Sequence, residues 1–265
     1  MASAPLREHG VEWLPGAEVG RIVLDRPERA NAIDRDSAAG IARAIFEVLD
    51  AGPRVIVLGA RGPIFCAGGD IRVFAGGGGD FEHVILDPLT NLLPAYRQLA
   101  EAPCPVVCVV NGPVGGAGLG LALLGDFVLA STTLKLRTGY AAIGLSPDVG
   151  ASWYLARRVG EVRARQWLML SEAVGAEECL AAGAVDALHA PDALDAAAEA
   201  LVAQLLARAP HSLAAVKRLT AADHRALVEH LELERELLRG CAKTTDAREG
   251  VRAFVEKRPP RFSGK

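Results

Sequence analysis

The stretch VVCVVNGPVGGAGLGLALLGDFVLAS occupies residues 106–131 and decides the fold. Its first five residues form an apolar run typical of a strand buried on both faces, and FVLAS at 127–131 is strand-like again. NGP at 111–113 predicts a turn, and the small residues at 115–124 predict a tightly packed helix. Residues 102–125 carry no charge and are long enough to span a bilayer, but NGP interrupts them. The stretch therefore predicts a strand, a helix and a second strand of a soluble protein.

The N-terminal part of the chain repeats this alternation of strand and helix. Strand-like runs are RIVLD at 21–25 and VIVLG at 55–59, and helical patterns begin at about Asp36 and extend over 84–101. Because strands that alternate with helices pair in parallel, we expect a largely parallel α/β core.

The pattern becomes helical after Pro147. Helices are predicted over 148–171, 175–182, 191–208 and 211–241, with a last one from Thr245. In the fourth of these, Leu227, Leu231 and Leu238 mark one apolar face. We expect a core over residues 1–200 and a C-terminal helical region over 201–265, which packs on the core or on another subunit.

Composition excludes several classes of function. The chain has 265 residues, of which 51% are hydrophobic and 23% charged, which is typical of a well-packed globular protein. The formal net charge is −3 and no basic run occurs, so we expect no nucleic-acid partner and no anionic membrane surface. Aromatic residues make up only 5%, which argues against platforms for base stacking.

The cysteines and histidines give no indication of a metal site or a disulfide framework. The five cysteines are scattered, and Cys104 and Cys108 flank a strand-like run without a neighbouring histidine. The six histidines are equally dispersed. The N-terminal residues lack the apolar core of a signal peptide. We therefore expect reduced thiols, no metal and a cytoplasmic location.

Two glycine-rich loops each follow a buried strand-like run. They are CAGGD at 66–70 and NGPVGGAG at 111–118. Neither fits the two common phosphate-binding templates, because GxGxxG is absent and the only Gly-Lys pair is at the C-terminus. Two such loops could each direct one backbone N–H group to the same point and form an oxyanion hole. They could equally be tight turns that allow close packing of helix on strand.

Five motifs in this order resemble those of the enoyl-CoA hydratase/isomerase (crotonase) superfamily. They are LDRPERANAID (24–34), FCAGGDI (65–71), NGPVGGAGLGLALLGD (111–126), IGLSPDVGASWYL (143–155) and EGVRAFVEKRPPRF (249–262). The resemblance implies an α/β spiral of ββα units with a C-terminal helical trimerisation region. It also implies homotrimers or dimers of trimers, and an acyl-CoA substrate. No separate cofactor is expected, because coenzyme A is part of that substrate.

The resemblance also implies roles for particular residues. The backbone N–H groups of Gly69 and Ala117 would form the oxyanion hole, although relatives usually have glycine at the second position. Contacts to the substrate or its coenzyme A part are implied for Ala30, Ala67, Asp70, Ile71, Tyr140, Phe254 and Lys257. Asp70 could equally cap the helix that follows it, and Tyr140 could simply line the pocket. GGGG at 76–79 predicts a mobile lid.

Both glutamates that hydratases of this family use to add water are missing. Gly120 and Tyr140 occupy the corresponding positions, so two-carboxylate water addition is not expected. Asp148 matches a catalytic aspartate of some isomerases and of a dehalogenase in the superfamily. Its alternative role is to cap the helix after it, where the helix dipole would lower its pKa.

One carboxylate and two N–H donors suffice to move a double bond, so the leading hypothesis is an enoyl-CoA isomerase with Asp148 as its base. The alternatives are a hydratase of the same superfamily, nucleophilic attack by Asp148 as in a hydrolase or dehalogenase, and a non-catalytic acyl-CoA binder.

Overall fold

A computed structural model describes residues 4–76, 80–221 and 224–265 of the chain. Most of the predicted lid, residues 77–79, therefore lies outside the described residues. The fold is built on a seven-stranded sheet with the order β1-β2-β3-β4-β5-β7-β10, and β6, β8 and β9 form a small second sheet. The strands are Leu6–Glu8 (β1), Val11–Leu14 (β2), Val19–Leu24 (β3), Val55–Ala60 (β4), Val106–Val110 (β5), Val114–Gly115 (β6), Phe127–Ser131 (β7), Lys135–Arg137 (β8), Val174–Gly175 (β9) and Ala187–His189 (β10).

The large sheet is antiparallel from β1 to β3 and parallel from β3 to β10, which confirms the predicted largely parallel core. Its central strands are buried on both faces because side chains alternate along each strand. In β4, Ile56 and Leu58 enter the main core, whereas Val55 and Val57 pack against α8 (Leu194–Leu206). This explains why the central strands are continuously apolar.

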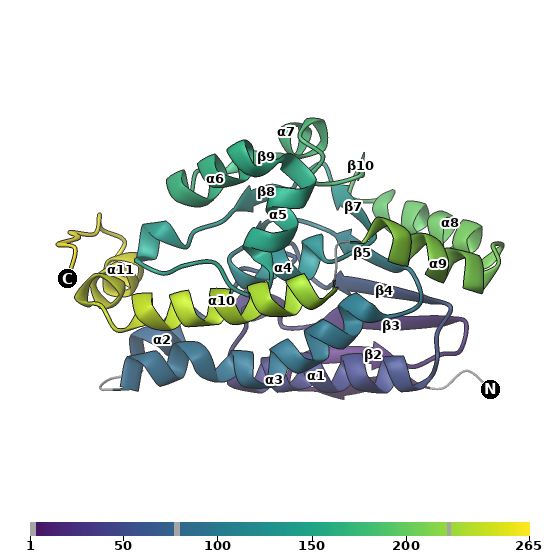
Figure 1. Ribbon diagram of the computed structural model, residues 1–265, viewed down its shortest axis with the longest axis horizontal. Coiled ribbons are helices and arrows are strands. Elements are labelled where there is room, and N and C mark those ends of the chain that lie inside the picture. The colour runs from purple at the N-terminus through teal and green to yellow at the C-terminus, as the bar shows by residue number, and fades with distance from the viewer. Residues whose placement is uncertain (1–3, 77–79, 222–223) are drawn as a thin grey trace.

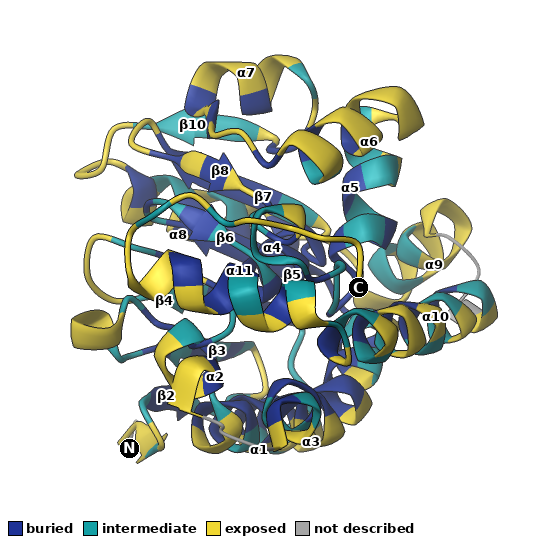
Figure 2. Ribbon diagram, turned by 90° about the vertical axis from the view of Figure 1, so that its left-hand side faces the viewer, coloured by how far each residue is buried: buried dark blue, intermediate teal, exposed yellow. Residues whose placement is uncertain are grey.

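Helices cover both faces of the sheet and extend beyond it (Figure 1). Besides α8, they are η1 (Pro27–Arg29), α1 (Arg35–Asp50), α2 (Ile71–Gly76), α3 (Phe81–Glu101), α4 (Ala117–Leu123), η3 (Ala141–Ile143), α5 (Ala151–Val159), α6 (Glu161–Leu170), α7 (Ala176–Ala181), α9 (Pro210–Thr220), α10 (His224–Ala242) and α11 (Thr245–Val255). α1 and α3 pack side by side, and α10 lies along α3. In Figure 2 the strands are largely buried and the outer helices alternate between buried and exposed residues.

The start of α1 illustrates how local sequence fixes an element near the first motif. Asp34 accepts a hydrogen bond from the Ser37 N–H group at 2.9 Å, and Ser37 Oγ accepts one from the Asp34 N–H group at 3.0 Å. This reciprocal capping satisfies N–H groups that a helix start leaves without partners. Arg26 binds both carboxylate oxygens of Asp34, at 2.9 and 2.7 Å, and so fixes the loop before the helix.

Two of the predicted helices are each divided in the structure. The helix predicted over 148–171 is interrupted at Gly160, whose φ of 81° separates α5 from α6. The helix predicted over 211–241 is divided into α9 and α10, because Ala221 after Thr220 is extended with φ −69° and ψ 150°. Several short strands, including β1 and β8, were not predicted from the sequence. None of the described helices is long and apolar enough to cross a membrane.

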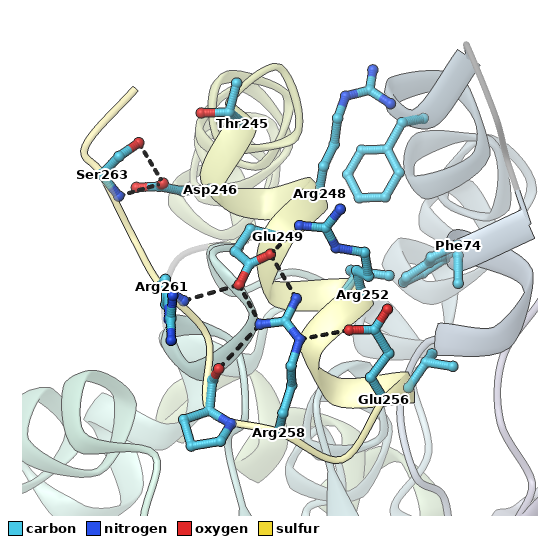
Figure 3. Close-up of a pocket in the computed structure, with 15 residues that line it drawn as sticks. Phe74, Thr245, Asp246, Arg248, Glu249, Arg252, Glu256, Arg258, Arg261 and Ser263 are labelled. Atoms are coloured by element: carbon cyan, nitrogen blue, oxygen red, sulfur yellow. Dashed lines mark hydrogen bonds and ion pairs between the residues drawn. The ribbon is translucent and has the colours of Figure 1, made fainter.

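The C-terminal tail, residues 256–265, folds back along α11, and charged residues bind it there (Figure 3). The guanidinium group of Arg258 donates to both carboxylate oxygens of Glu249, at 2.6 and 2.9 Å. Asp246 accepts hydrogen bonds from the backbone N–H groups of Ser263 and Gly264, both at 2.7 Å. α2, α11 and the tail enclose a groove of about 1080 Å³.

Candidate active site

The two glycine-rich loops meet because they follow neighbouring parallel strands, β4 and β5. The Gly115 N–H group donates to the Cys66 carbonyl oxygen at 2.9 Å, which joins the loops directly. Gly68 has a φ of +93°, and a Cβ atom there would lie 2.9 Å from the Gly115 oxygen and 3.2 Å from the Ala117 nitrogen. Only glycine permits this approach, so the small residues of both loops serve close backbone contact.

The N–H groups of Gly69 and Ala117 face no acceptor among the described residues. The Ile33 N–H group donates to the Gly68 carbonyl oxygen at 2.7 Å, and the Ile33 carbonyl oxygen accepts from the Asp70 N–H group at 2.8 Å. Neither bond uses the N–H group of Gly69, which lies between these two residues. Ala117 is the first residue of α4, where N–H groups have no intrahelical acceptor. Both N–H groups are therefore available to a ligand.

Gly69 and Ala117 line a cavity of about 260 Å³ with mostly apolar walls. The other described residues that line it are Ala67, Ile71, Phe74, Ile85, Gly115, Gly116, Arg137, Thr138, Gly139, Tyr140, Ala142, Ile143, Leu145, Asp148, Leu238 and Phe254. Asp148 is the only acidic side chain in this set. A cavity of this kind suits an apolar group next to one reactive polar centre.

Asp148 and Tyr140 form a hydrogen-bonded pair in the cavity wall. Tyr140 lies directly before η3, and its hydroxyl group donates to Asp148 Oδ1 at 2.7 Å. Tyr140 is 6% exposed, so its ring is held in the wall while its hydroxyl group reaches Asp148. Tyr140 thus lies in the cavity wall and also donates a hydrogen bond, while its contact with a substrate stays a prediction.

Burial raises the pKa of Asp148 to about 7. The hydrogen bond from Tyr140 opposes this increase, and the nearby negative charge of Glu234 adds to it. The expected lowering of this pKa by a helix dipole is thus wrong, because desolvation of the carboxylate outweighs the other effects. A carboxyl group with a pKa near neutrality can both take up and return a proton at physiological pH.

Capping of the following helix by Asp148 is also contradicted. α5 begins at Ala151, and its N-cap residue is Gly150, which has no side chain. Glu234 of α10 accepts hydrogen bonds from the N–H groups of Gly150 and Ser152, at 2.7 and 3.1 Å. Because another carboxylate performs the capping, the side chain of Asp148 is directed to Tyr140 instead.

Gly120 leaves no room for the glutamate that hydratases place at this position. A Cβ atom built on Gly120 would lie 1.8 Å from the carbonyl oxygen of Val149. On another side, the hydroxyl group of Tyr96 donates to the Gly120 carbonyl oxygen at 2.9 Å. Close backbone contact with Val149 therefore restricts position 120 to a residue without a side chain.

The other predicted substrate contacts divide into two groups. Ala67, Ile71 and Phe254 line the cavity beside Gly69, and Phe254 is 57% exposed at its rim. Ala30 and Lys257 are not among its described lining residues.

Ala30 has a left-handed φ of 54° and accepts a hydrogen bond from the Ala67 N–H group at 3.0 Å, so it supports the first loop. Lys257 is exposed just beyond α11.

Asp70 is buried beneath the loop and does not line the cavity among the described residues. Its Oδ1 atom accepts a hydrogen bond from the Arg72 N–H group at 3.1 Å, and Arg29 lies 3.5 Å from its Oδ2 atom. Asp70 therefore caps α2, which was the alternative to a contact with coenzyme A.

Sequence reasoning missed Glu234 and Ser152. A signal for Glu234 was present, because it lies within the apolar stripe of α10 marked by Leu231 and Leu238. An acidic residue in such a stripe requires buried partners. Nothing in the local sequence distinguishes Ser152 from an exposed serine.

Residues 16–265 match the family model described as enoyl-CoA hydratase/isomerase. The chain belongs to the enoyl-CoA hydratase/isomerase family. This membership confirms the resemblance inferred from the five sequence motifs, and the two glycine-rich loops and Asp148 all lie within the matched residues.

Several named proteins align with nearly the whole chain. One is 1,2-epoxyphenylacetyl-CoA isomerase of Escherichia coli, which is 34% identical over 92% of this chain and 94% of its own length. A probable enoyl-CoA hydratase of Rhodobacter capsulatus is 37% identical over 97% and 99% of the two chains. The trans-2-decenoyl-[acyl-carrier-protein] isomerase of Streptococcus mutans is 31% identical over 93% and 95%.

The fold agrees with solved structures of the enoyl-CoA hydratase/isomerase family. An enoyl-CoA hydratase of Mycobacterium avium subsp. paratuberculosis superimposes with a TM-score of 0.84, at 31% identity, over 97% of this chain and 100% of that one. The predicted crotonase-like α/β fold of ββα units with C-terminal helices is therefore confirmed.

Proposed function

We propose that the protein is an enoyl-CoA double-bond isomerase in which Asp148 carries the proton and the backbone N–H groups of Gly69 and Ala117 bind the thioester oxygen. One observation carries the proposal: Asp148 is the only acidic side chain among the described residues of a cavity that Gly69 and Ala117 also line.

The reaction needs one group that takes and returns a proton. The ionised carboxylate of Asp148 removes a proton from C2 of a 3-enoyl thioester, and the electrons move through the conjugated carbons to the thioester oxygen. The resulting dienolate accepts hydrogen bonds from Gly69 and Ala117. Protonated Asp148 then delivers its proton to C4, which leaves a 2-enoyl thioester and restores the carboxylate.

One further observation favours isomerisation over hydration. The contact between Gly120 and Val149 excludes a second carboxylate at the position where hydratases use one. The names of the similar proteins described above favour neither reaction, since two are isomerases and two are hydratases.

The remaining expectations belong to this proposal. Coenzyme A is part of the substrate, and its contacts would include Ala67, Ile71 and Phe254 at the cavity, with Ala30 and Lys257 further out. We also propose that the chain assembles as homotrimers or dimers of trimers, which light scattering during size-exclusion chromatography would test.

The deciding experiment is NMR of the protein with a 3-enoyl-CoA in deuterated water, beside the Asp148→Asn variant. We expect wild-type protein to move the double bond to the 2-position, and the variant to lose this activity by about 100-fold or more. Equal rates for the two proteins would contradict the role of Asp148.

The same samples distinguish the alternative reactions. If Asp148 were a nucleophile, intact-mass spectrometry during turnover would detect a covalent acyl adduct on the wild type alone. Tight binding without conversion, over several chain lengths and double-bond positions, would indicate a non-catalytic binder.

A further inference from the structure

Glu234 is an acidic residue buried on the face of α10 that packs into the core. It lies between Leu231 and Leu238 on that face, and only 4% of its surface is exposed. Its carboxylate accepts three hydrogen bonds, from Gly150 N at 2.7 Å, Ser152 N at 3.1 Å and Ser152 Oγ at 2.5 Å. A buried carboxylate is stable only when such donors bind it. The side chain of Glu234 is therefore bound to the start of α5.

The segment that Glu234 holds contains a strained turn. Val149 and Gly150 have left-handed φ angles of 48° and 73°. A β-branched residue such as Val149 rarely adopts this conformation, so the surrounding structure must impose it. Glu234 binds the N–H group of Gly150, which is the peptide group directly after Val149.

The turn determines the direction of Asp148, which immediately precedes it. The carboxyl group of Asp148 faces Tyr140 at 2.7 Å and the cavity, rather than the N–H groups of Gly150 and Ser152 at the start of α5. Those N–H groups are already bound by Glu234, so Asp148 has no competing partner there.

We propose that Glu234 is a positioning residue: it holds the turn at Val149 and Gly150 so that the carboxyl group of Asp148 faces Tyr140 and the acyl cavity. The kinetic part of this proposal rests on the proposed isomerase function, whereas the titration of Asp148 does not.

Glu234 also acts on Asp148 through its charge. The titratable groups that influence or are influenced by Asp148 are Tyr140 beside η3, Glu234 on α10, Cys66 in the first loop and Tyr96 on α3. After burial, the negative charge of Glu234 is the next effect that raises the pKa of Asp148. Glu234 itself faces His230, whose Nε2 atom lies 3.6 Å from its Oε1 atom and 2.8 Å from Ser152 Oγ.

Two substitutions of Glu234 separate the effect of its hydrogen bonds on the turn from the effect of its charge on Asp148. Glu234→Gln removes the charge and retains one acceptor oxygen, whereas Glu234→Asp retains the charge and withdraws the carboxylate by one methylene group. Glu236→Gln is the matched control, because it removes the same charge from an exposed position of the same helix. The titration is followed by ¹³C NMR of aspartate-labelled protein, with the Asp148 carboxyl signal assigned by its loss in Asp148→Asn.

In Glu234→Gln we expect the titration midpoint of Asp148 to fall by about 1 pH unit. We expect kcat to fall roughly 10- to 100-fold in both Glu234 variants with little change in KM, because the base is misplaced. The midpoint in Glu234→Asp stays close to that of the wild type, and the Glu236→Gln control matches the wild type in both measurements.

The proposal is overturned if Glu234→Gln keeps the wild-type midpoint and kcat, or if it behaves like Glu236→Gln. If Glu234→Gln does not fold, an unchanged kcat in Glu234→Asp overturns it instead. A wild-type protein without isomerase activity would contradict the proposed function, and the NMR midpoints would still decide the role of Glu234.

Discussion

Gly120 and Val149 are in direct backbone contact, since a Cβ atom on Gly120 would lie 1.8 Å from the carbonyl oxygen of Val149. α4, which begins at one proposed oxyanion-hole donor, thereby touches the residue next to Asp148. A side chain at position 120 would therefore displace the backbone segment that carries Asp148.

The first prediction concerns this contact. Gly120→Ala should lower the free energy of unfolding by about 1–3 kcal/mol, because α4 or the turn at Val149 must move to admit the methyl group. The isomerase activity should fall about 10-fold or more, because Asp148 moves with the turn. Urea unfolding and the 3-enoyl-CoA assay measure the two effects.

Gly240→Ala is the matched control for this prediction. Gly240 lies in α10, and a Cβ atom there would meet no described atom within 4 Å. This variant should be as stable as the wild type or more stable by about 0.5–1 kcal/mol. Wild-type stability and activity in Gly120→Ala would show that the contact is not restrictive.

The second prediction concerns stability and pH. The pKa of Asp148 is about 7 in the folded protein and near its ordinary value of about 3.9 when unfolded. The folded state therefore binds more protons between these values, so this group's contribution to stability is lost as the pH rises through 7. At pH 8 its ionisation costs on the order of 4 kcal/mol.

Asp148→Asn cannot ionise and should therefore gain thermal stability relative to the wild type as the pH rises. The measurement is the difference in Tm between the two proteins from pH 5 to pH 8. A difference that stays constant over this range would contradict the raised pKa.

The third prediction concerns the hydrogen bond from Tyr140. Because this bond stabilises the charged form of Asp148, Tyr140→Phe should raise the pKa of Asp148 further. The acidic limb of the pH profile of kcat/KM should move to higher pH by about 1 unit. Tyr154→Phe removes a nearby hydroxyl group but leaves the pair intact, so its profile should match that of the wild type.

The fourth prediction concerns the second oxyanion-hole donor. Ala117→Pro removes the backbone N–H group, and proline is tolerated in the first turn of a helix. The activity should fall about 100- to 1000-fold while circular dichroism shows the fold retained.

Ala176→Pro is the matched control, since Ala176 also follows a glycine and begins a helix. Retained activity in Ala117→Pro, or equal losses in both variants, would argue against a role for this donor.

The fifth prediction concerns the C-terminal tail. Glu249→Gln weakens its binding to Arg258, so trypsin should cleave after Arg261 several-fold faster than in the wild type. Glu256→Gln removes one partner of Arg258 and should have a smaller effect. High salt should reduce the difference between the variants, because these ion pairs are partly exposed.

The sequence was sufficient to predict the parallel strands and both glycine-rich loops. Apolar runs are needed by strands that are buried on both faces, and glycine clusters by turns with close backbone contacts, so both can be recognised locally. Asp148 and Tyr140 were selected through the family resemblance rather than through any local pattern. The sequence could not predict the pKa of Asp148, since that depends on burial by segments distant in sequence. The capping of α5 was missed for the same reason: Glu234 lies 84 residues beyond Gly150.

The capping of α5 by the distant Glu234 also affects the order in which the segments of the protein fold. β4, β5 and both glycine-rich loops can pair before α10 is synthesised, but the turn beside Asp148 cannot be fixed until Glu234 arrives. Such long-range contacts form late, because their loop-closure entropy must be overcome first. The two glycine-rich loops would thus be joined before the turn beside Asp148 is fixed, and catalytic competence would report completed folding of α10.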